Sequence, residues 1–451
     1  MLFKQPLLAE KFRRSTNDRD KNDIRYQTYV NILKEELVPA FGCTEPIALA
    51  YAAAKARQTL GALPDRVLLQ VSGSIIKNVK SVIVPNTGHL KGMPAAAAAG
   101  IIAGDPDREL EVISQVPEEK IKEIREFLGN VRIDVEHIDN GHVFDIIVTE
   151  YKGDSSARVR ILDTHTNIVW IEKDNKVLYE KSAGHTPEAK AETTSSSDRS
   201  LLNMEGIWDF ITTVDVADIS DILDRQIRYN SAIAEEGLRG DYGANIGTVL
   251  LRSSGNDIAT RAKAWAAAGS DARMNGCELP VIINSGSGNQ GITCSVPLIE
   301  YARELNSDHE TLCRALALSN LVAIHEKTGI GTLSAYCGAV SAGAGAGAGI
   351  AYLCGGDYQA VIHTVVNALA ITSGIVCDGA KASCAAKIAF SVDAGILGFH
   401  MYQNGQEFKS GDGIVMKDIE STIRGIGMLG KDCMRETNNE IIRLMVGEEK
   451  C

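Results

Sequence analysis

Three cysteines have contexts and a spacing that could do chemistry. Cys337 lies in SAYCGAV, and Cys377 and Cys384 lie together in CDGAKASC, where Gly379 allows the chain to turn back between them. On an unbroken helix the last two thiols would be about 10.5 Å apart, which is long for a single ion and better suited to a cluster. The chain contains no C-x-x-C pair, which argues against a zinc ribbon. Because a buried cysteine also packs as a small hydrophobic residue, the spacing leaves a metal role and a structural role both open.

A fourth cysteine lies in the segment FGCTEP at 41–46. Thr44 is a suitable N-cap for a following helix, and Pro46 is tolerated in its first turn. A thiol beside a helix N-terminus should have a lowered pKa, so Cys43 is a candidate base or nucleophile. Glu45 is a candidate proton acceptor or ammonium partner. The alternative is that Cys43 is a buried apolar residue beside the cap.

A glycine-rich segment, INSGSGNQG at 283–291, follows an apolar run and precedes helical residues. Free N–H groups at such a helix start bind anions, so we expect a small carboxylate there, held by Ser285, Ser287, Asn289 and Gln290. The segment is neither a P-loop nor a dinucleotide fingerprint, and a plain turn is an equal alternative. Weaker ligand-binding candidates are Thr44 beside Cys43 and, at predicted strand ends, Ser72, Ser74, Asn86 and Thr87.

Hydrophobic patterning predicts an N-terminal region of helices and antiparallel strands. The helices span Asp23–Val38 and the Ala-rich stretch from Thr44 to Leu60. Strands are expected at Arg66–Ser72, Ser81–Pro85, Val131–Ile138, His142–Tyr151, Ala157–Asp163 and Ile168–Lys173. The segments 139–141 and 174–176 are typical of hairpin turns. The fold class is therefore α+β.

The second half of the chain has long helical patterns and many small residues. Helices are predicted at Ile207–Ile233, Asp257–Ala268, Ser295–Leu305 and Thr311–Lys327. Of the 42 glycines, 31 lie beyond residue 200, which indicates close helix packing. We therefore expect an N-terminal extension at 1–22, an α+β domain at 23–200 with a Ser/Thr-rich loop at 182–199, and an all-α Gly/Ala-rich domain at 201–451 that carries the cysteine cluster.

Composition excludes several functional classes. The 451 residues include 46 Lys and Arg against 58 Asp and Glu, so the net charge of −12 disfavours nucleic acid and anionic lipid. The N-terminus lacks an apolar signal run, so we expect a cytoplasmic chain with reduced thiols. The uncharged stretch from Leu333 to Cys354 is long enough to cross a bilayer, but its Gly and Ala content favours buried helices and no membrane. A domain of this kind could form a homodimer.

The three motifs FGCTEP, SGSGNQG and CDGAKASC, in this order, resemble the L-cysteine desulfidase family, which is similar to the α chains of iron–sulfur L-serine dehydratases. The resemblance covers about residues 24–445. It implies a lyase that acts on a small amino acid without PLP and uses an oxygen-labile 4Fe–4S cluster held by Cys337, Cys377 and Cys384. Cys43 matches the reactive cysteine of that family. L-cysteine would be converted to pyruvate, ammonium and sulfide by removal of the α-proton and loss of sulfide.

Three other interpretations stay open. An L-serine dehydratase would keep the fold and the cofactor, with Cys451 as the ligand of the fourth iron, although a frayed tail is the simpler account of that residue. A PLP lyase would use Lys381 as its Schiff base, but the usual context of a PLP lysine is missing. A redox sensor built on the same cysteines would have a cluster and produce no pyruvate.

Overall fold

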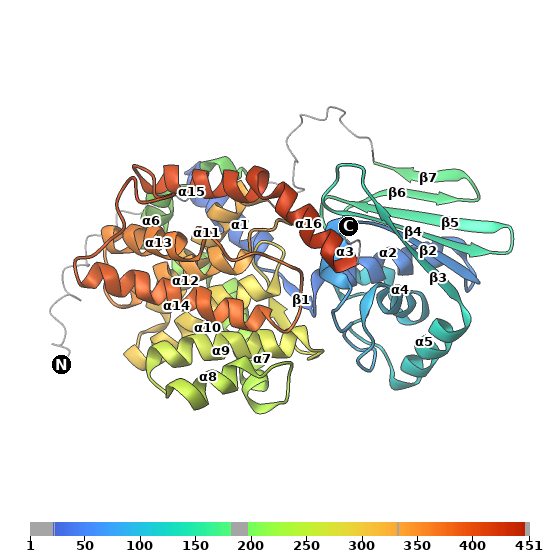
Figure 1. The fold of residues 1–451 in the computed structure, drawn as a ribbon, viewed down its shortest axis with the longest axis horizontal. Helices are drawn as coiled ribbons and strands as arrows, with labels where there is room; N and C mark the ends of the chain where they lie inside the picture. The colour runs from blue at the N-terminus through green and yellow to red at the C-terminus, as the bar shows by residue number, and fades with distance from the viewer. Residues whose placement is uncertain (1–20, 22, 182–196, 332, 447–451) are drawn as a thin grey trace.

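The computed structural model describes residues 21, 23–181, 197–331 and 333–446. Two lobes lie side by side, one built on a sheet and the other built of helices (Figure 1). Strands in the N-terminal half and helices in the C-terminal half confirm the predicted α+β fold class. Residues 1–20, most of the expected loop at 182–199 and Cys451 lie outside the described residues.

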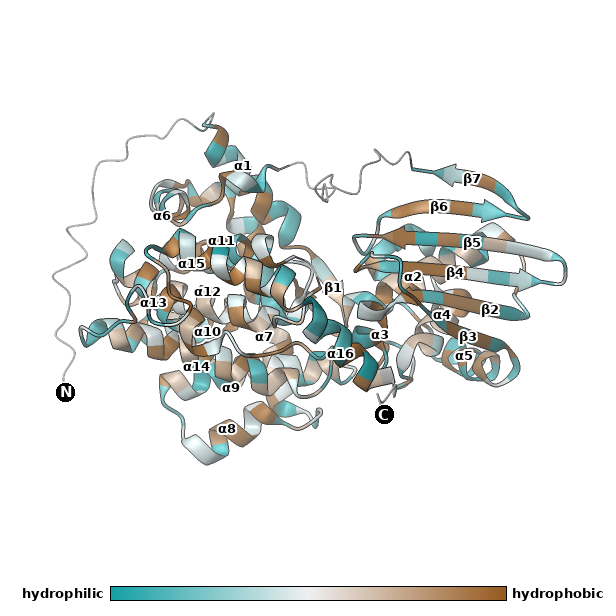
Figure 2. Ribbon diagram, turned by 45° about the horizontal axis from the view of Figure 1, so that its top comes forward, coloured by the Kyte–Doolittle hydropathy of each residue, from teal (hydrophilic) through white to brown (hydrophobic). Residues whose placement is uncertain are grey.

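The sheet lobe consists of one six-stranded sheet with helices against one face (Figure 2). Its strands, in spatial order, are β3 (Arg132–Ile138), β2 (Arg66–Ser72), β4 (Asp145–Lys152), β5 (Ser155–Leu162), β6 (Ile168–Lys173) and β7 (Lys176–Glu180). The helices are α2 (Thr44–Leu60), α3 (Gly73–Val79), α4 (Gly92–Ala103) and α5 (Glu118–Asn130). Alternate residues of β2, namely Val67, Leu69 and Val71, are buried in a common core with α2 and α4.

Two predictions for this sheet are wrong. Residues 81–85 form no strand, and only Ile83 makes an isolated bridge, to Lys91. Residues 139–141 do not close a hairpin, because β2 lies between β3 and β4 and pairs with β3 in parallel. The helical crossover between β2 and β3 makes that parallel pair possible. The second predicted hairpin is confirmed, since Lys173 pairs with Lys176 across the turn between β6 and β7.

The helical lobe is a layered bundle. Its helices are α6 (Met204–Thr213), α7 (Ser220–Arg239), α8 (Ile246–Ser254), α9 (Ile258–Met274), α10 (Gly288–Leu305), α11 (His309–Ile330), α12 (Gly338–Leu353), α13 (Tyr358–Thr372), α14 (Cys384–Gln403) and α15 (Ile419–Met428). The predicted helix Ile207–Ile233 is interrupted, because the Asp215 side chain caps a short 3-10 turn at Val216–Asp218.

Helix α12 lies at the centre of the helical lobe, in contact with α10, α11, α13 and α14. A Cβ atom on Gly343 would lie 2.5 Å from the carbonyl oxygen of Ser391 in α14, and one on Gly345 would lie 2.5 Å from that of Ser319 in α11. Glycine therefore permits backbone contacts that a side chain would prevent. The interpretation of Leu333–Cys354 as a buried helix is confirmed.

Both ends of the described chain cross between the lobes. Helix α1 (Ile24–Glu36) belongs to the helical core, where Tyr26 and Tyr29 pack edge-on against Phe210. Strand β1 (Pro39–Phe41) then pairs with β8 (Pro280–Ile282). Helix α16 (Arg435–Val446) returns to pack against α3 of the sheet lobe. The expected division at residues 23–200 and 201–451 thus differs from the packing, in which α1 joins the helical lobe.

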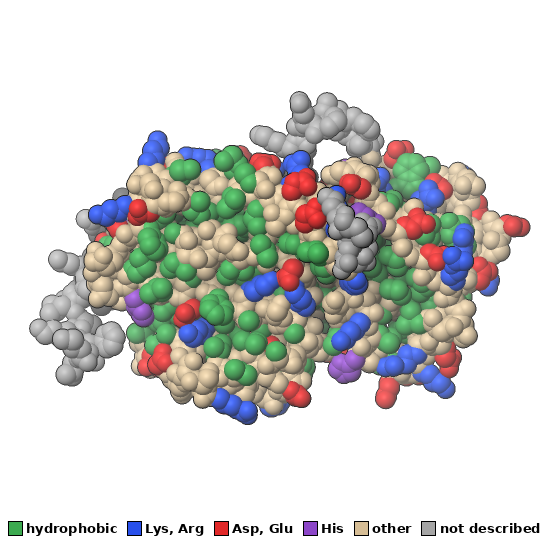
Figure 3. All heavy atoms as spheres, in the orientation of Figure 1, with side chains coloured by type: hydrophobic (Ala, Val, Ile, Leu, Met, Phe, Trp, Pro, Cys, Tyr) green, Lys and Arg blue, Asp and Glu red, His purple; other side chains and the backbone are tan. Residues whose placement is uncertain are grey.

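One described helix, α14, is long and apolar enough to cross a membrane. More than half of its most apolar stretch is buried against other helices, as in a core helix. Its outer side carries the exposed Phe390 and Leu397, and hydrophobic side chains are spread over this face of the helical lobe (Figure 3). The homodimer expected from the sequence stays a prediction.

Candidate functional site

A cavity of about 110 Å³ is lined by residues of both lobes. This volume is well below the roughly 300 Å³ at which pockets for drug-sized ligands begin, so the site suits a small molecule. Ten of the residues singled out from the sequence line it: Cys43, Thr44, Glu45, Ser285, Ser287, Asn289, Gln290, Cys337, Cys377 and Cys384. Segments more than 300 residues apart in the chain therefore meet at one site.

The four candidates at predicted strand ends do not line this cavity. The Ser72 hydroxyl donates to the carbonyl of Val143, and the Thr87 hydroxyl donates to that of Val84. The Asn86 amide donates to the carbonyl of Ile113. These side chains hold turns and strand ends of the sheet lobe, and Ser74 is buried in α3.

Four helices begin at the cavity wall. Cys43 is the N-cap of α2, Ser287 that of α10 and Cys337 that of α12, while Cys384 is the first residue of α14. The N-terminus of a helix carries a partial positive charge and free N–H groups. Four such ends at one cavity favour anionic occupants, such as thiolates and a carboxylate.

Cys337 and Cys377 are held together by a short backbone pairing. The Cys337 N–H donates to the carbonyl of Ile375 at 3.2 Å, and the Cys377 N–H donates to that of Ala335 at 2.6 Å. The hydrogen bond from the Cys337 thiol lowers the Cys377 pKa well below its usual value, with help from Lys77 and against the effect of burial. One of the two sulfurs is therefore ready to be a thiolate ligand.

The expected return of the chain between Cys377 and Cys384 is present. Gly379 has φ +93°, and a Cβ atom there would lie 2.1 Å from the carbonyl oxygen of Lys77. Glycine is thus required twice, for the backbone conformation and for the close approach to α3. The loop turns back, so both thiols line the same cavity.

Two buried lysines lie beside these thiols, and sequence reasoning missed both. Lys77 is 2% exposed and donates to the carbonyls of Ser334 and Cys377 and to Asn438 Oδ1 at 2.7 Å in α16. Lys327 is 6% exposed and lines the cavity; burial lowers its pKa to about 8, against the opposing effect of Cys377. Buried lysines are rare unless they are paired, and here both lower the pKa of the Cys377 thiol.

The expectation of a lowered pKa for Cys43 is wrong. Its side chain is 1% exposed, and its sulfur lies 3.8 Å from the sulfur of Met274. Burial raises the Cys43 pKa to about 12, and the opposing effect of Arg273 is smaller. Desolvation of a buried thiolate outweighs the helix dipole, so Cys43 is a neutral thiol at neutral pH.

Arg273 lies beneath the glycine-rich loop. A Cβ atom on Gly288 would lie 2.3 Å from Arg273 Nε, so glycine makes room for the guanidinium group. One nitrogen, Nη1, donates to Asn289 Oδ1 at 3.2 Å, while Nε is buried with no hydrogen-bond partner among the described residues. An arginine with free donors is suited to a carboxylate. No motif marks Arg273 in the sequence, because its approach to the loop depends on how α9 packs against α10.

Glu45 occupies another part of the cavity wall. Its two carboxylate oxygens accept hydrogen bonds from the Thr44 hydroxyl at 3.2 Å and the Asn78 amide at 3.5 Å. The Thr44 hydroxyl also lies 3.0 Å from the carbonyl oxygen of Gly286 and joins α2 to the glycine-rich loop. The carboxylate is therefore positioned as a partner for a substrate ammonium group.

His165 is a further residue that sequence reasoning missed. It lies between β5 and β6, packs edge-on against Phe144, and reaches the cavity beside Gly286. Its Nε2 atom is buried with no hydrogen-bond partner among the described residues. Burial lowers its pKa below the usual value of 6.5, so the imidazole is neutral at neutral pH. A neutral imidazole in a ligand cavity is a candidate proton acceptor.

The donor set suits a cluster better than a single metal ion. Four cysteine thiols line the cavity, yet no three metal-ligating atoms among its described residues lie within 4.8 Å of one another. Thiolates that bind different irons of one cluster are farther apart than thiolates on a single ion.

Lys381, the lysine considered for PLP, does not line the cavity and donates to the carbonyls of Asp378 and Gly379.

Comparisons with known proteins agree with this class of site. A family model described as the serine dehydratase alpha chain matches residues 107–443. Similar proteins include a UPF0597 protein of Desulfitobacterium hafniense, 58% identical over 95% of this chain and 99% of its own length. A UPF0597 protein of Treponema denticola is 46% identical over 94% of this chain and 98% of its own. The chain belongs to the serine dehydratase alpha-chain family, and this membership supports a dehydratase-like lyase.

Proposed function

We propose that this protein is an L-cysteine desulfidase that eliminates sulfide from L-cysteine and yields pyruvate and ammonium. The observation that carries the proposal is the meeting of four helix N-termini at one small cavity lined by Cys43, Cys337, Cys377 and Cys384. Family membership supports the reaction class, and the FGCTEP motif supports L-cysteine as the substrate.

Substrate binding is assigned to two charged groups of the cavity. Arg273 binds the substrate carboxylate through its free Nε donor, together with the N–H groups and side chains at Ser285–Gln290. Glu45, oriented by Thr44 and Asn78, binds the ammonium group. Neutralising the carboxylate stabilises the negative charge that develops when the α-proton leaves.

Proton transfer is assigned to His165. Its Nε2 atom accepts the α-proton because the imidazole is neutral and the atom has no other described partner. Cys43 keeps its proton at neutral pH, so it is better suited to donate a hydrogen bond than to act as the base. The carbon–sulfur bond then breaks, and the aminoacrylate product takes up water to give pyruvate and ammonium.

Cys337, Cys377 and Cys384 would hold a 4Fe–4S cluster. Alpha chains of serine dehydratases are typically iron–sulfur enzymes. When bound, a cluster with three protein thiolates supplies an open iron that acts as a Lewis acid on the leaving group. Lys77 and Lys327 offset the negative charge of the sulfur ligands.

An L-serine dehydratase is the second candidate, because the family description names serine. Its cavity would use the same carboxylate and ammonium contacts, and the leaving group would be hydroxide.

The test is anaerobic reconstitution with ferrous iron and sulfide, removal of the excess, and assay of pyruvate on L-cysteine and L-serine side by side. We expect pyruvate and sulfide in equal amounts from L-cysteine, and none from a Cys384→Ala variant treated identically. Preference for L-serine would establish the second candidate. A cluster with no pyruvate from either amino acid would favour a redox sensor.

A further inference from the structure

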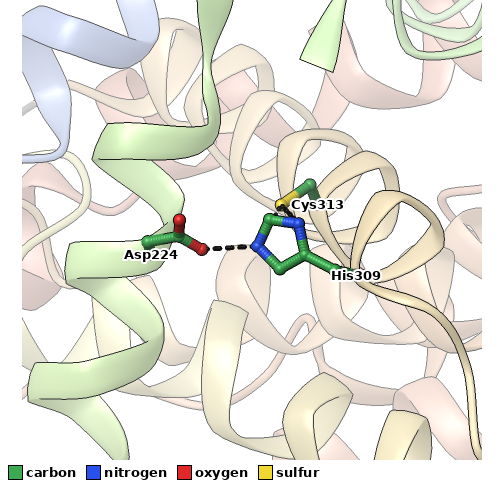
Figure 4. Close-up of side chains that lie close together, drawn as sticks. All are labelled: Asp224, His309 and Cys313. Atoms are coloured by element: carbon green, nitrogen blue, oxygen red, sulfur yellow. Dashed lines mark hydrogen bonds and ion pairs between the residues drawn. The ribbon is translucent and has the colours of Figure 1, made fainter. Parts of the chain in front are cut away.

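A second group of ligand-type side chains lies outside the cavity, between α7 and α11. Asp224 lies on α7, while His309 and Cys313 lie one helical turn apart at the start of α11, and the three side chains point toward one another (Figure 4). One ligand atom from each lies within 4.8 Å of the other two. The His309 and Asp224 side chains are 58% and 47% exposed, whereas Cys313 is buried, so the group is open to solvent from the side of the histidine and the carboxylate.

The three ligand-type groups meet around the His309 ring. Asp224 Oδ1 lies 2.6 Å from His309 Nε2, and Cys313 Sγ lies 3.6 Å from the same Nε2 and 3.9 Å from Nδ1. In a catalytic relay the carboxylate and the nucleophile address opposite nitrogens of the imidazole. Here the sulfur lies at nearly equal distances from both nitrogens and so makes no relay, and the carboxylate, imidazole and thiol are close enough to share one ion.

The thiol is also unsuited to nucleophilic work. Burial raises the Cys313 pKa to about 12, and the Asp224 carboxylate adds to that effect. A thiol of this kind stays protonated until a metal ion displaces its proton. The neighbouring cation, Arg314, is engaged with Glu310 and with the carbonyls of Ile211 and Val214, so it does not occupy the space between the three ligands.

We propose that Asp224, His309 and Cys313 bind one divalent transition-metal ion of the zinc type, with water as the fourth ligand. Imidazole, thiolate and carboxylate are the ligands that zinc prefers in tetrahedral sites. A carboxylate and a thiolate balance the two positive charges of the ion, which would otherwise be unfavourable near a helix N-terminus. The ion would join α7 to α11 at the surface of the helical lobe, on residues that the proposed elimination does not use.

The test measures zinc bound per chain after dialysis of the full-length protein against zinc chloride. Because the cavity thiols can also bind zinc, the decisive quantity is the difference between wild type and His309→Ala, in which those thiols are unchanged. His363→Ala is the matched control, since His363 also pairs with a carboxylate, Glu407, at 2.6 Å and no three-ligand group is described there.

Wild type and His363→Ala are expected to hold one more zinc per chain than His309→Ala. The site of the wild type should also bind zinc at least about 10-fold more tightly than the site of Asp224→Asn. Cys313→Ser should lose the same zinc, and the thiolate absorption of a bound cobalt ion should fall with it. Equal zinc in wild type and His309→Ala would overturn the proposal. So would equal losses in His309→Ala and His363→Ala, which would indicate nonspecific binding to exposed histidines.

Discussion

The two lobes contribute to the cavity in different ways. The helical lobe presents the starts of α10, α12 and α14, which bring thiols and N–H groups to fixed positions. The sheet lobe and its neighbouring segments contribute Glu45, Asn78 and His165, each from a different place in the chain. The helical side is thus built for anions, and the sheet side for the ammonium group and the proton. The proposed amino-acid substrate would meet the helical side with its carboxylate and the sheet side with its ammonium group.

The sheet side is tested most severely at His165. His165→Gln should keep the iron content and lower kcat by about 10² to 10⁴, the usual effect of losing a general base. His142→Gln is the control, because His142 is an exposed histidine of the same lobe, outside the cavity. Normal turnover in His165→Gln would remove the proton-transfer role.

His165 should also determine how turnover depends on pH. Burial lowers the His165 pKa below 6.5, so the imidazole loses its proton at a lower pH than an ordinary histidine does. Above that pH it is the neutral base. Turnover should therefore be constant through neutral pH and fall only in more acidic solution. The acidic limb of kcat against pH checks this, and it should be absent from the residual activity of His165→Gln.

The helical side is tested next at Arg273. Hydrogen bonds to charged groups contribute about 1.5–3 kcal/mol each, so Arg273→Gln should lower kcat/KM for L-cysteine by roughly 10². Arg252→Gln, on the exposed surface of α8, is the control. Cysteamine, which lacks the carboxylate, should react poorly with wild type, and its kcat/KM should fall little further in Arg273→Gln. Equal losses on both compounds would mean that Arg273 has only a structural role.

A smaller effect is expected at Glu45. Glu45→Gln keeps hydrogen-bonding capacity and removes the charge that attracts the ammonium group, so KM should rise by about 10-fold with kcat nearly unchanged. Glu119→Gln, at an exposed position of α5, serves as the reference. A fall in kcat with unchanged KM would instead place Glu45 in the chemical step.

The smallest effects on catalysis are expected for residues that lie just outside the cavity. Ser72→Ala and Thr87→Ala remove hydroxyls that hold turns outside the cavity. Each should destabilise the sheet lobe by about 1 kcal/mol and leave kcat/KM within about 2-fold of wild type. Thermal unfolding and steady-state kinetics measured together separate the two effects, and a selective loss of kcat/KM would extend the site to these residues.

The sequence predicted the parts of this site that local rules govern. The helix Thr44–Leu60 and the turn at Gly379 depend on hydrophobic patterning and backbone conformation, which short segments determine, although the predicted N-cap, Thr44, is wrong and Cys43 holds that position. Arg273 and His165 were missed because only tertiary packing brings α9 and the loop between β5 and β6 to the cavity. The pKa of Cys43 was mispredicted because its helix position is local, whereas its burial depends on Met274 and other distant residues.

The central claim is that the thiols gathered at the helix starts hold an iron–sulfur cluster. Its most direct test is the iron and acid-labile sulfide content of anaerobically reconstituted wild type and of Cys337→Ala, Cys377→Ala and Cys384→Ala. The account predicts about four irons and four sulfides per wild-type chain and loss of the visible absorbance in each variant. A Cys377→Ala protein with a full complement of iron and sulfide would contradict it.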